Sequence, residues 1–176
     1  MSRVKKKPSR TIEHRYYDLP LDVPAILLTG DDWTISDIIS GSLHFHNCTE
    51  IGFCHGGRGF IEFETGQKLP FEASDILIIP RNVSHTTYSL KDEPSLWSYI
   101  FLDFAKLFSR IPYSPLTGSY QTPDEQIPDV YLYKQSTDRH IHFLATCLLD
   151  EIKSKKDDWA LVFSSTALLL KFKLAN

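Results

Sequence analysis

The sequence has few cysteines, no long apolar run and no excess of basic residues. Its three cysteines, Cys48, Cys54 and Cys147, form no CxxC pair, which argues against a secreted disulfide framework and against a cysteine-only zinc site. No apolar run approaches the roughly 20 residues of a membrane-spanning helix, and no apolar segment follows the basic N-terminus as in a signal peptide. With 19 Lys and Arg against 22 Asp and Glu, the formal net charge is -3, whereas domains that grip phosphate backbones carry a basic excess. We therefore expect a cytoplasmic chain that contacts no membrane and does not bind DNA directly.

Most of the chain, which at 176 residues fits one domain of ordinary size, has a β pattern. Short alternating runs, broken by Gly, Asn, Asp or Pro, follow one another closely, which predicts a mainly β antiparallel sandwich or barrel. In the run 59–64, Ile61 and Phe63 share one face and Glu62 lies on the other, so this strand is expected to have one buried and one wet face. The other runs are residues 25–28, 43–45, 50–54, 75–79, 85–88 and 97–104.

The pattern changes in the last third of the chain. A proline-rich stretch, residues 112–128, predicts a loop-like connection. Apolar residues then recur at helical spacing, which predicts helices over about 138–153 and 159–174. Such an apolar pair can be covered by the barrel, by a second subunit, or by both, and we expect a homodimer through these helices. The apolar residues of the second helix are Leu161, Val162, Phe163, Thr166, Leu168, Leu169, Leu170 and Phe172.

Three histidines and one glutamate form the most specific pattern in the sequence. His44 and His46 lie two residues apart and therefore share one face of a strand. Glu50 has the same parity, and His85 comes from a later strand. Three imidazoles and one carboxylate suit a divalent transition metal such as Zn, Fe, Mn or Ni, with positions left open for a further ligand. A polar pocket that holds an organic ligand without metal is the alternative.

These residues resemble the two sequence motifs of the cupin superfamily. In the first motif, G-x5-H-x-H-x3-4-E-x6-G, the last four positions are His44, His46, Glu50 and Gly57, while the opening glycine is displaced to Gly41. In the second, G-x5-P-x-G-x2-H-x3-N, Pro80 and His85 fit. The resemblance implies a cupin-type antiparallel β-barrel, a double-stranded β-helix or jelly roll, followed here by a C-terminal helical pair. Positions that the second motif fills with Gly, Gly and Asn hold Ser74, Asn82 and Ser89.

The sequence around these motifs also resembles the N-terminal domain of AraC-family transcription regulators. That resemblance implies an N-terminal arm (1–25), an effector-binding cupin barrel (26–104), a connecting segment (105–136) and two dimerisation helices (137–176). The effector would be a sugar or a similar small polar molecule. The family's DNA-binding domain has roughly 100 residues in two helix-turn-helix units, and nothing after the second helix could supply it. We expect an excised sensing domain, or a natural stand-alone cupin, that binds no DNA by itself.

Aromatic residues on one predicted strand complete the candidate ligand site. Trp97, Tyr99 and Phe101 share a strand face and could stack on a sugar or aromatic ring, or could simply pack the core. Arg58 and Arg81 lie near turns and are expected to face solvent. The rival hypothesis is a metal-dependent cupin enzyme, a dioxygenase or isomerase, with the three histidines and Glu50 as ligands. Glu62 and Tyr99 are conceivable acids or bases, but no spacing argument favours either. Because the flanking sequence resembles the AraC-family domain, we expect a sensor and not an enzyme.

Overall fold

The computed structural model describes residues 10–109 and 130–174, and within these ranges eleven strands form two sheets. One sheet has the order β1-β4-β9-β6-β7, and the other has the order β11-β8-β5-β10-β2, with β3 also paired to β10. The first sheet contains β1 (Thr11–Arg15), β4 (Ser42–His46), β6 (Arg58–Phe63), β7 (Lys68–Glu72) and β9 (His85–Ser89). The second contains β2 (Ala25–Leu28), β3 (Thr34–Ile35), β5 (Thr49–Gly56), β8 (Ile76–Ile79), β10 (Ser95–Leu102) and β11 (Tyr131–Tyr133).

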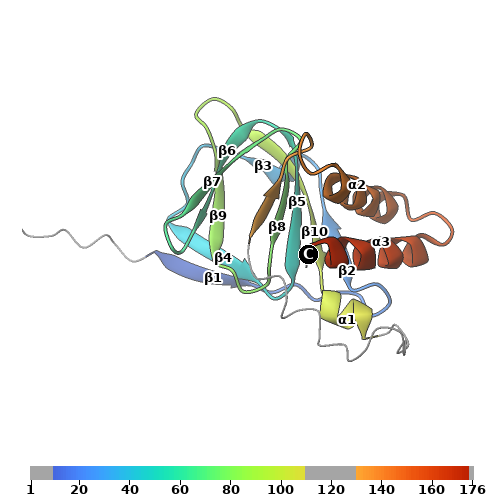
Figure 1. Cartoon of the computed structure of the whole chain (residues 1–176). Helices are drawn as coiled ribbons and strands as arrows, with labels where there is room; N and C mark the ends of the chain where they lie inside the picture. Colours follow the sequence, from blue (N-terminus) through green and yellow to red (C-terminus); the bar gives the residue numbers. More distant parts are fainter. Residues whose placement is uncertain (1–9, 110–129, 175–176) are drawn as a thin grey trace, which may run out of the picture.

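The chain crosses repeatedly between these sheets, which face each other in Figure 1. Neighbouring strands such as β4 and β9, or β5 and β10, are therefore far apart in sequence. The described pairs are antiparallel except β1 with β4, which run parallel. The two sheets are not hydrogen-bonded into one closed ring. This crossing pattern is that of a jelly roll, and it confirms the predicted mainly β, cupin-type fold.

A helical hairpin covers the outer face of the second sheet (Figure 1). It consists of α2 (Arg139–Ser154) and α3 (Trp159–Leu174), close to the predicted 138–153 and 159–174. A short helix, α1 (Phe104–Phe108), follows β10, and the side chain of Asp103 caps it by accepting a hydrogen bond from the Lys106 N–H. A 3-10 turn, η1 (Asp31–Trp33), precedes β3. Within the described ranges, no helix is long and apolar enough to cross a lipid bilayer.

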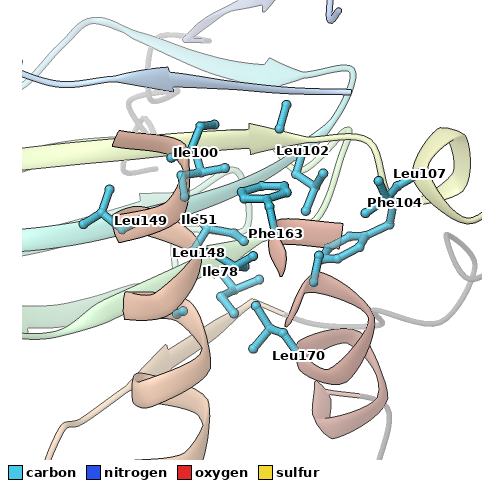
Figure 2. Packing of buried hydrophobic residues seen from close by; sticks show 14 of the residues in the cluster. Ile51, Ile78, Ile100, Leu102, Phe104, Leu107, Leu148, Leu149, Phe163 and Leu170 are labelled. Carbon is cyan, nitrogen blue, oxygen red and sulfur yellow. The ribbon is translucent and has the colours of Figure 1, made fainter. Parts of the chain in front are cut away.

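The second sheet separates two hydrophobic clusters because its side chains alternate between its faces. On β10, Ile100 and Leu102 point outward to the helices, whereas Tyr99 and Phe101 point into the barrel. The outer cluster consists of aliphatic residues and phenylalanines, and Phe163 of α3 is fully buried against the strands (Figure 2). The labelled contributors in that figure are Ile51, Ile78, Ile100, Leu102, Phe104, Leu107, Leu148, Leu149, Phe163 and Leu170.

Several features of the fold differ from the sequence prediction. Strands β1, β3, β7 and β11 were not expected; β1 lies in the range assigned to the arm, and β11 in the range assigned to the connecting segment. The expectation that Glu62 lies on a wet face was wrong: Glu62 is only 6% exposed because Arg10 and Lys68 cover it, with Arg10 Nη1 3.0 Å from its Oε1. The predicted loop over residues 112–128 lies outside the described residues.

The apolar face of α3 is only partly used by the barrel. The side chains of Phe163, Ala167 and Leu170 are fully buried, and Leu174 is 6% exposed. Four other large apolar side chains of α3 remain exposed: Leu161, Val162, Leu169 and Phe172. The barrel therefore covers one side of this helix and leaves an apolar surface on the other.

Candidate metal and ligand site

The four residues predicted as metal ligands meet inside the barrel. His44 and His46 point inward from β4, Glu50 points inward from β5 of the facing sheet, and His85 begins β9 directly opposite His44. One ligand atom of each residue lies within 4.8 Å of the others. His46, Glu50 and His85 are buried, and His44 is half-buried. The jelly-roll crossings thus bring together residues that are up to 41 positions apart.

Hydrogen bonds fix the tautomers of two of these imidazoles. His46 Nδ1 lies 3.3 Å from the Arg15 carbonyl oxygen, and His85 Nδ1 lies 2.9 Å from the Val83 carbonyl oxygen. Because a carbonyl can only accept, both Nδ1 atoms carry the proton when the ring is neutral. Each Nε2 atom then presents a lone pair toward the Glu50 carboxylate, which is the arrangement common to metal-ligating histidines.

The Glu50 carboxylate lies at the centre of the group. Its Oε2 is 2.9 Å from His46 Nε2 and 3.4 Å from His85 Nε2. The 2.9 Å contact does not have hydrogen-bond geometry, so His46 Nε2 is buried without a hydrogen-bond partner among the described residues. Two lone-pair nitrogens and a carboxylate oxygen so close together repel unless a proton or metal ion lies among them. This donor set therefore fits a divalent transition metal.

The titration of the site also favours cation binding. Burial raises the pKa of the Glu50 carboxyl, but the neighbouring imidazoles of His85 and His46 outweigh burial and hold this pKa below its usual range. Burial, followed by the neighbouring imidazole of His85, lowers the pKa of His44 to about 3. The His44 ring is then neutral at pH 7 and has a lone pair to offer, while Glu50 carries a negative charge.

A cavity of about 190 Å³ opens next to these four residues. Its volume is below the 300–1,000 Å³ or so of sites for drug-sized molecules, so it suits a small ligand. Tyr99 and Phe101 line it, as predicted, but Trp97 does not. Trp97 lies deeper in the core, where it packs against Phe71 and donates a hydrogen bond to Ser95 Oγ. The remaining lining residues, which the sequence did not reveal, are Arg15, Tyr17, Trp33, Ile35, Ser40, Thr86 and Thr87.

The backbone of the motif residues explains how the site is held. Gly57 has a φ of 77°, and a Cβ there would lie 2.3 Å from the Pro94 carbonyl oxygen, so this position needs glycine. Ser74 and Asn82, which replace motif glycines, have φ values of 74° and 64°. They keep the left-handed turns that the motif requires. The Asn82 N–H donates to the His46 carbonyl oxygen at 2.8 Å, which ties the turn before β9 to β4.

Other polar residues considered from the sequence lie away from the cavity. Arg58 is exposed and forms an ion pair with Glu93 at 2.5 Å. Arg81 is exposed, and neither arginine lines the cavity. His55 contacts Ser98 Oγ on the outer face of the second sheet.

Comparison with known proteins gives likenesses of fold. No protein-family model and no curated protein matches the sequence. Among solved structures, a cupin protein from Bacteroides fragilis is 23% identical with a TM-score of 0.35, and the match covers 56% of this chain and 76% of that one. A Cupin 2 conserved barrel domain protein from Salinispora arenicola is also 23% identical, with a TM-score of 0.37 and coverages of 51% and 84%.

ToxT from Vibrio cholerae, solved with a bound unsaturated fatty acid, matches over more of this chain. It is 14% identical with a TM-score of 0.44, and the match covers 86% of this chain and 55% of ToxT. The chain thus corresponds to about half the length of ToxT. The structure therefore defines a protein with a cupin-type fold and, inside the barrel, a group of side chains that could hold a metal ion.

Proposed function

We propose that this chain is the effector-sensing and dimerisation domain of an AraC-type transcription regulator in the cytoplasm. A small polar molecule, such as a sugar or sugar derivative, would bind in the barrel at a divalent metal held by His44, His46, Glu50 and His85. The observation that carries this proposal is the second sheet, whose inner face lines the cavity and whose outer face packs against the helical hairpin. The three cysteines are free, which suits a reducing compartment.

Adjacent residues of this sheet connect the cavity with the helices. Glu50 and Phe101 line the cavity, while the next residues, Ile51 and Leu102, belong to the cluster beneath α2 and α3. A ligand that shifts β5 or β10 therefore also changes the surface on which the hairpin packs. Such a ligand moves the conformational equilibrium only as far as its affinities for the two states differ. The bound metal would act as a Lewis acid toward an oxygen atom of the ligand.

A second copy of this chain is the proposed occupant of the exposed apolar surface of α3. Leu169 is 57% exposed and Phe172 is 50% exposed, and Leu161 and Val162 extend the same surface. Phe143 of α2 is also exposed. In analytical ultracentrifugation we expect a dimer for the wild type and a monomer for Leu169→Glu. The control Leu21→Glu changes an exposed leucine that is not part of α2 or α3, and this variant should remain dimeric.

The proposal treats the chain as a sensor and not as a metal-dependent enzyme. Glu62, one conceivable acid, lies on the opposite face of its sheet and pairs with Arg10 and Lys68. Burial, with a smaller contribution from the Glu50 charge, raises the pKa of Tyr99 well above its usual value, which makes its phenol a poor acid at pH 7. The 176-residue chain has a formal net charge of -3, so we also expect no sequence-specific DNA binding by this chain in a gel-shift assay.

A thermal-shift screen of sugars and small acids tests the sensing proposal. Ligands that raise the melting temperature of the wild type should fail to do so in His46→Ala and His85→Ala. The control His140→Ala removes an exposed imidazole of α2 and should respond like the wild type. Normal responses in both cavity variants would place the binding site elsewhere.

A further inference from the structure

One cationic side chain, Arg15 of β1, lies beside the metal-ligand group. In the parallel pairing of β1 with β4, Glu13 is opposite His44 and Arg15 is opposite His46. Directly paired residues of neighbouring strands point to the same face of a sheet. The residue between them confirms this orientation, because His14 stacks on Phe45 with ring centroids 4.6 Å apart, on the other face. Arg15 is therefore on the cavity side of the sheet.

The backbone around Arg15 is held in place on both sides. Its carbonyl oxygen accepts the hydrogen bond from His46 Nδ1. Tyr17, two residues after Arg15, makes two backbone hydrogen bonds with the side chain of Asn47. The Tyr17 N–H donates to Asn47 Oδ1 at 2.8 Å, and Asn47 Nδ2 donates to the Tyr17 carbonyl oxygen at 2.9 Å. Arg15 is thus a fixed part of the cavity wall, and no other Lys or Arg among the described residues lines the cavity.

The guanidinium group of Arg15 remains available to a ligand. Its side chain is 45% exposed, and its partner is Glu13, whose carboxylate lies 3.4 Å from Nε and from Nη2 and is itself 57% exposed. Ion pairs this exposed and this long are weak. A carboxylate inside the cavity could form a bidentate pair with the same group, in surroundings that screen charges less.

Charge balance points to the same class of ligand. A divalent metal would outweigh the single negative charge of Glu50, and the Arg15 guanidinium lies at the cavity wall with the exposed Glu13 carboxylate as its only ion-pair partner among the described residues. The cavity also has an aromatic lining, with the Tyr17 and Phe101 ring centroids 4.2 Å apart, and this lining provides apolar surface for the rest of a small molecule.

We infer that the cavity selects a small carboxylate over a neutral molecule of the same shape, and that Arg15 binds the carboxylate group. This inference rests on the proposed function, because it names the ligand class of the same cavity. It favours sugar acids or aromatic acids over neutral sugars. Arg15 acts here in binding and has no catalytic role.

Matched pairs of an acid and its neutral counterpart test the inference. The probes are benzoate with benzamide and galacturonate with galactose, titrated calorimetrically into zinc-loaded protein at constant ionic strength. We expect binding of at least one acid and binding of its neutral counterpart that is weaker by about tenfold or more. Arg15→Ala should weaken acid binding on the order of ten- to a hundredfold, and Arg15→Lys less, because an ammonium group keeps the charge but not the bidentate geometry.

Two further variants separate recognition from folding. Glu13→Gln removes the competing carboxylate and should bind the acid as tightly as the wild type or more tightly. Arg58→Ala removes an exposed arginine outside the cavity and should leave acid binding unchanged. All four variants should keep the zinc stoichiometry of the wild type, since none of these side chains is a predicted metal ligand.

Three results would overturn the inference: equal binding of acids and neutral counterparts, unchanged acid binding in Arg15→Ala, or no binding of either acid. If galactose binds and His46→Ala abolishes that binding, the sensing site stands and only the selectivity for acids fails. If His46→Ala and His85→Ala leave every ligand response unchanged, the sensing site itself fails.

Discussion

The two faces of the sheet β11-β8-β5-β10-β2 come from the same short strands but have opposite chemistry. The outer face carries isoleucine, leucine and phenylalanine, and the helical hairpin packs against it. The hairpin residues Leu148 and Phe163 are fully buried in this contact. The inner face carries Glu50, Tyr99 and Phe101 beside a cavity. A buried carboxylate on the inner face has a free-energy cost that aliphatic packing does not have. The comparison teaches that stability comes mainly from the outer face, whereas the inner face is adapted to hold a ligand.

The largest expected effect is on the outer face. Phe163→Ala should lower the free energy of unfolding by about 3–5 kcal/mol, because a fully buried ring leaves a cavity that its neighbours only partly fill. Urea denaturation measures this loss. The control Lys153→Ala, at an exposed side chain of the same hairpin outside the proposed dimer surface, should change stability by less than about 0.5 kcal/mol. Similar losses in the two variants would mean that the hairpin does not pack as described.

The inner face should respond in binding more than in stability. Glu50→Gln keeps the shape of the side chain but removes the charged ligand, and should weaken zinc affinity by more than about 100-fold, since even residues that only support metal ligands contribute 10- to 100-fold. Isothermal titration calorimetry of tag-free protein measures the affinity. Glu62→Gln is the matched control: its carboxylate is also buried, but on the opposite face of its sheet, so zinc affinity should not change.

Glu62, on the outer face of the first sheet, provides a pH test of the difference between a buried carboxylate held by ion pairs and Glu50 inside the barrel. Burial raises the pKa of Glu62, but hydrogen bonds and charge from Arg10, then Lys68, outweigh it and leave this pKa below its usual value. A carboxyl with a lowered folded pKa stabilises the fold above its ordinary pKa of about 4.3, and that stabilisation is lost as the pH falls below it. Glu62→Gln should therefore cost about 1 kcal/mol at pH 7 and progressively less below about pH 4. A cost that does not depend on pH would contradict the ion-pair explanation.

The smallest expected effect concerns the turn that carries the chain from β7 to β8, between the sheets. Ser74 has a φ of 74°, where a side chain is strained and glycine is not. Ser74→Gly should raise the free energy of unfolding by up to about 1 kcal/mol, because relief of strain slightly exceeds the added flexibility of the unfolded chain. Ser74→Ala keeps the strain and should bring no gain in thermal denaturation.

The sequence was sufficient to predict the metal-ligand group and the two helices, but not the full boundary of the cavity. Parity along β4 and β5 placed His44, His46 and Glu50 on one face, and the motif placed Asn82 at a glycine position, where the structure has a positive φ. Helical periodicity predicted α2 and α3 within a residue at each end. These features are local, so they can be recognised in a single sequence.

Features that depend on distant contacts were missed. All five residues of β1 are exposed, so its pattern did not indicate a strand, and only pairing with β4 brings Arg15 to the cavity. The strand β7 contains Pro70, a residue that disfavours strands, and the edge position of β7 accommodates it. Trp97 shares the face of Tyr99 and Phe101, but its depth in the barrel depends on Phe71 and Gly52. The same holds for Glu62, which is buried by Arg10, 52 residues away.

The central claim is that the inner face forms a metal centre, and metal content per chain tests it most directly. The protein would be purified without a histidine tag and without added metal, side by side with His46→Ala, and both would be measured by elemental analysis. The account predicts close to one Zn, Fe, Mn or Ni ion per wild-type chain and little or none in the variant. Folded wild-type protein that contains no metal and takes up none of these ions on titration would contradict it.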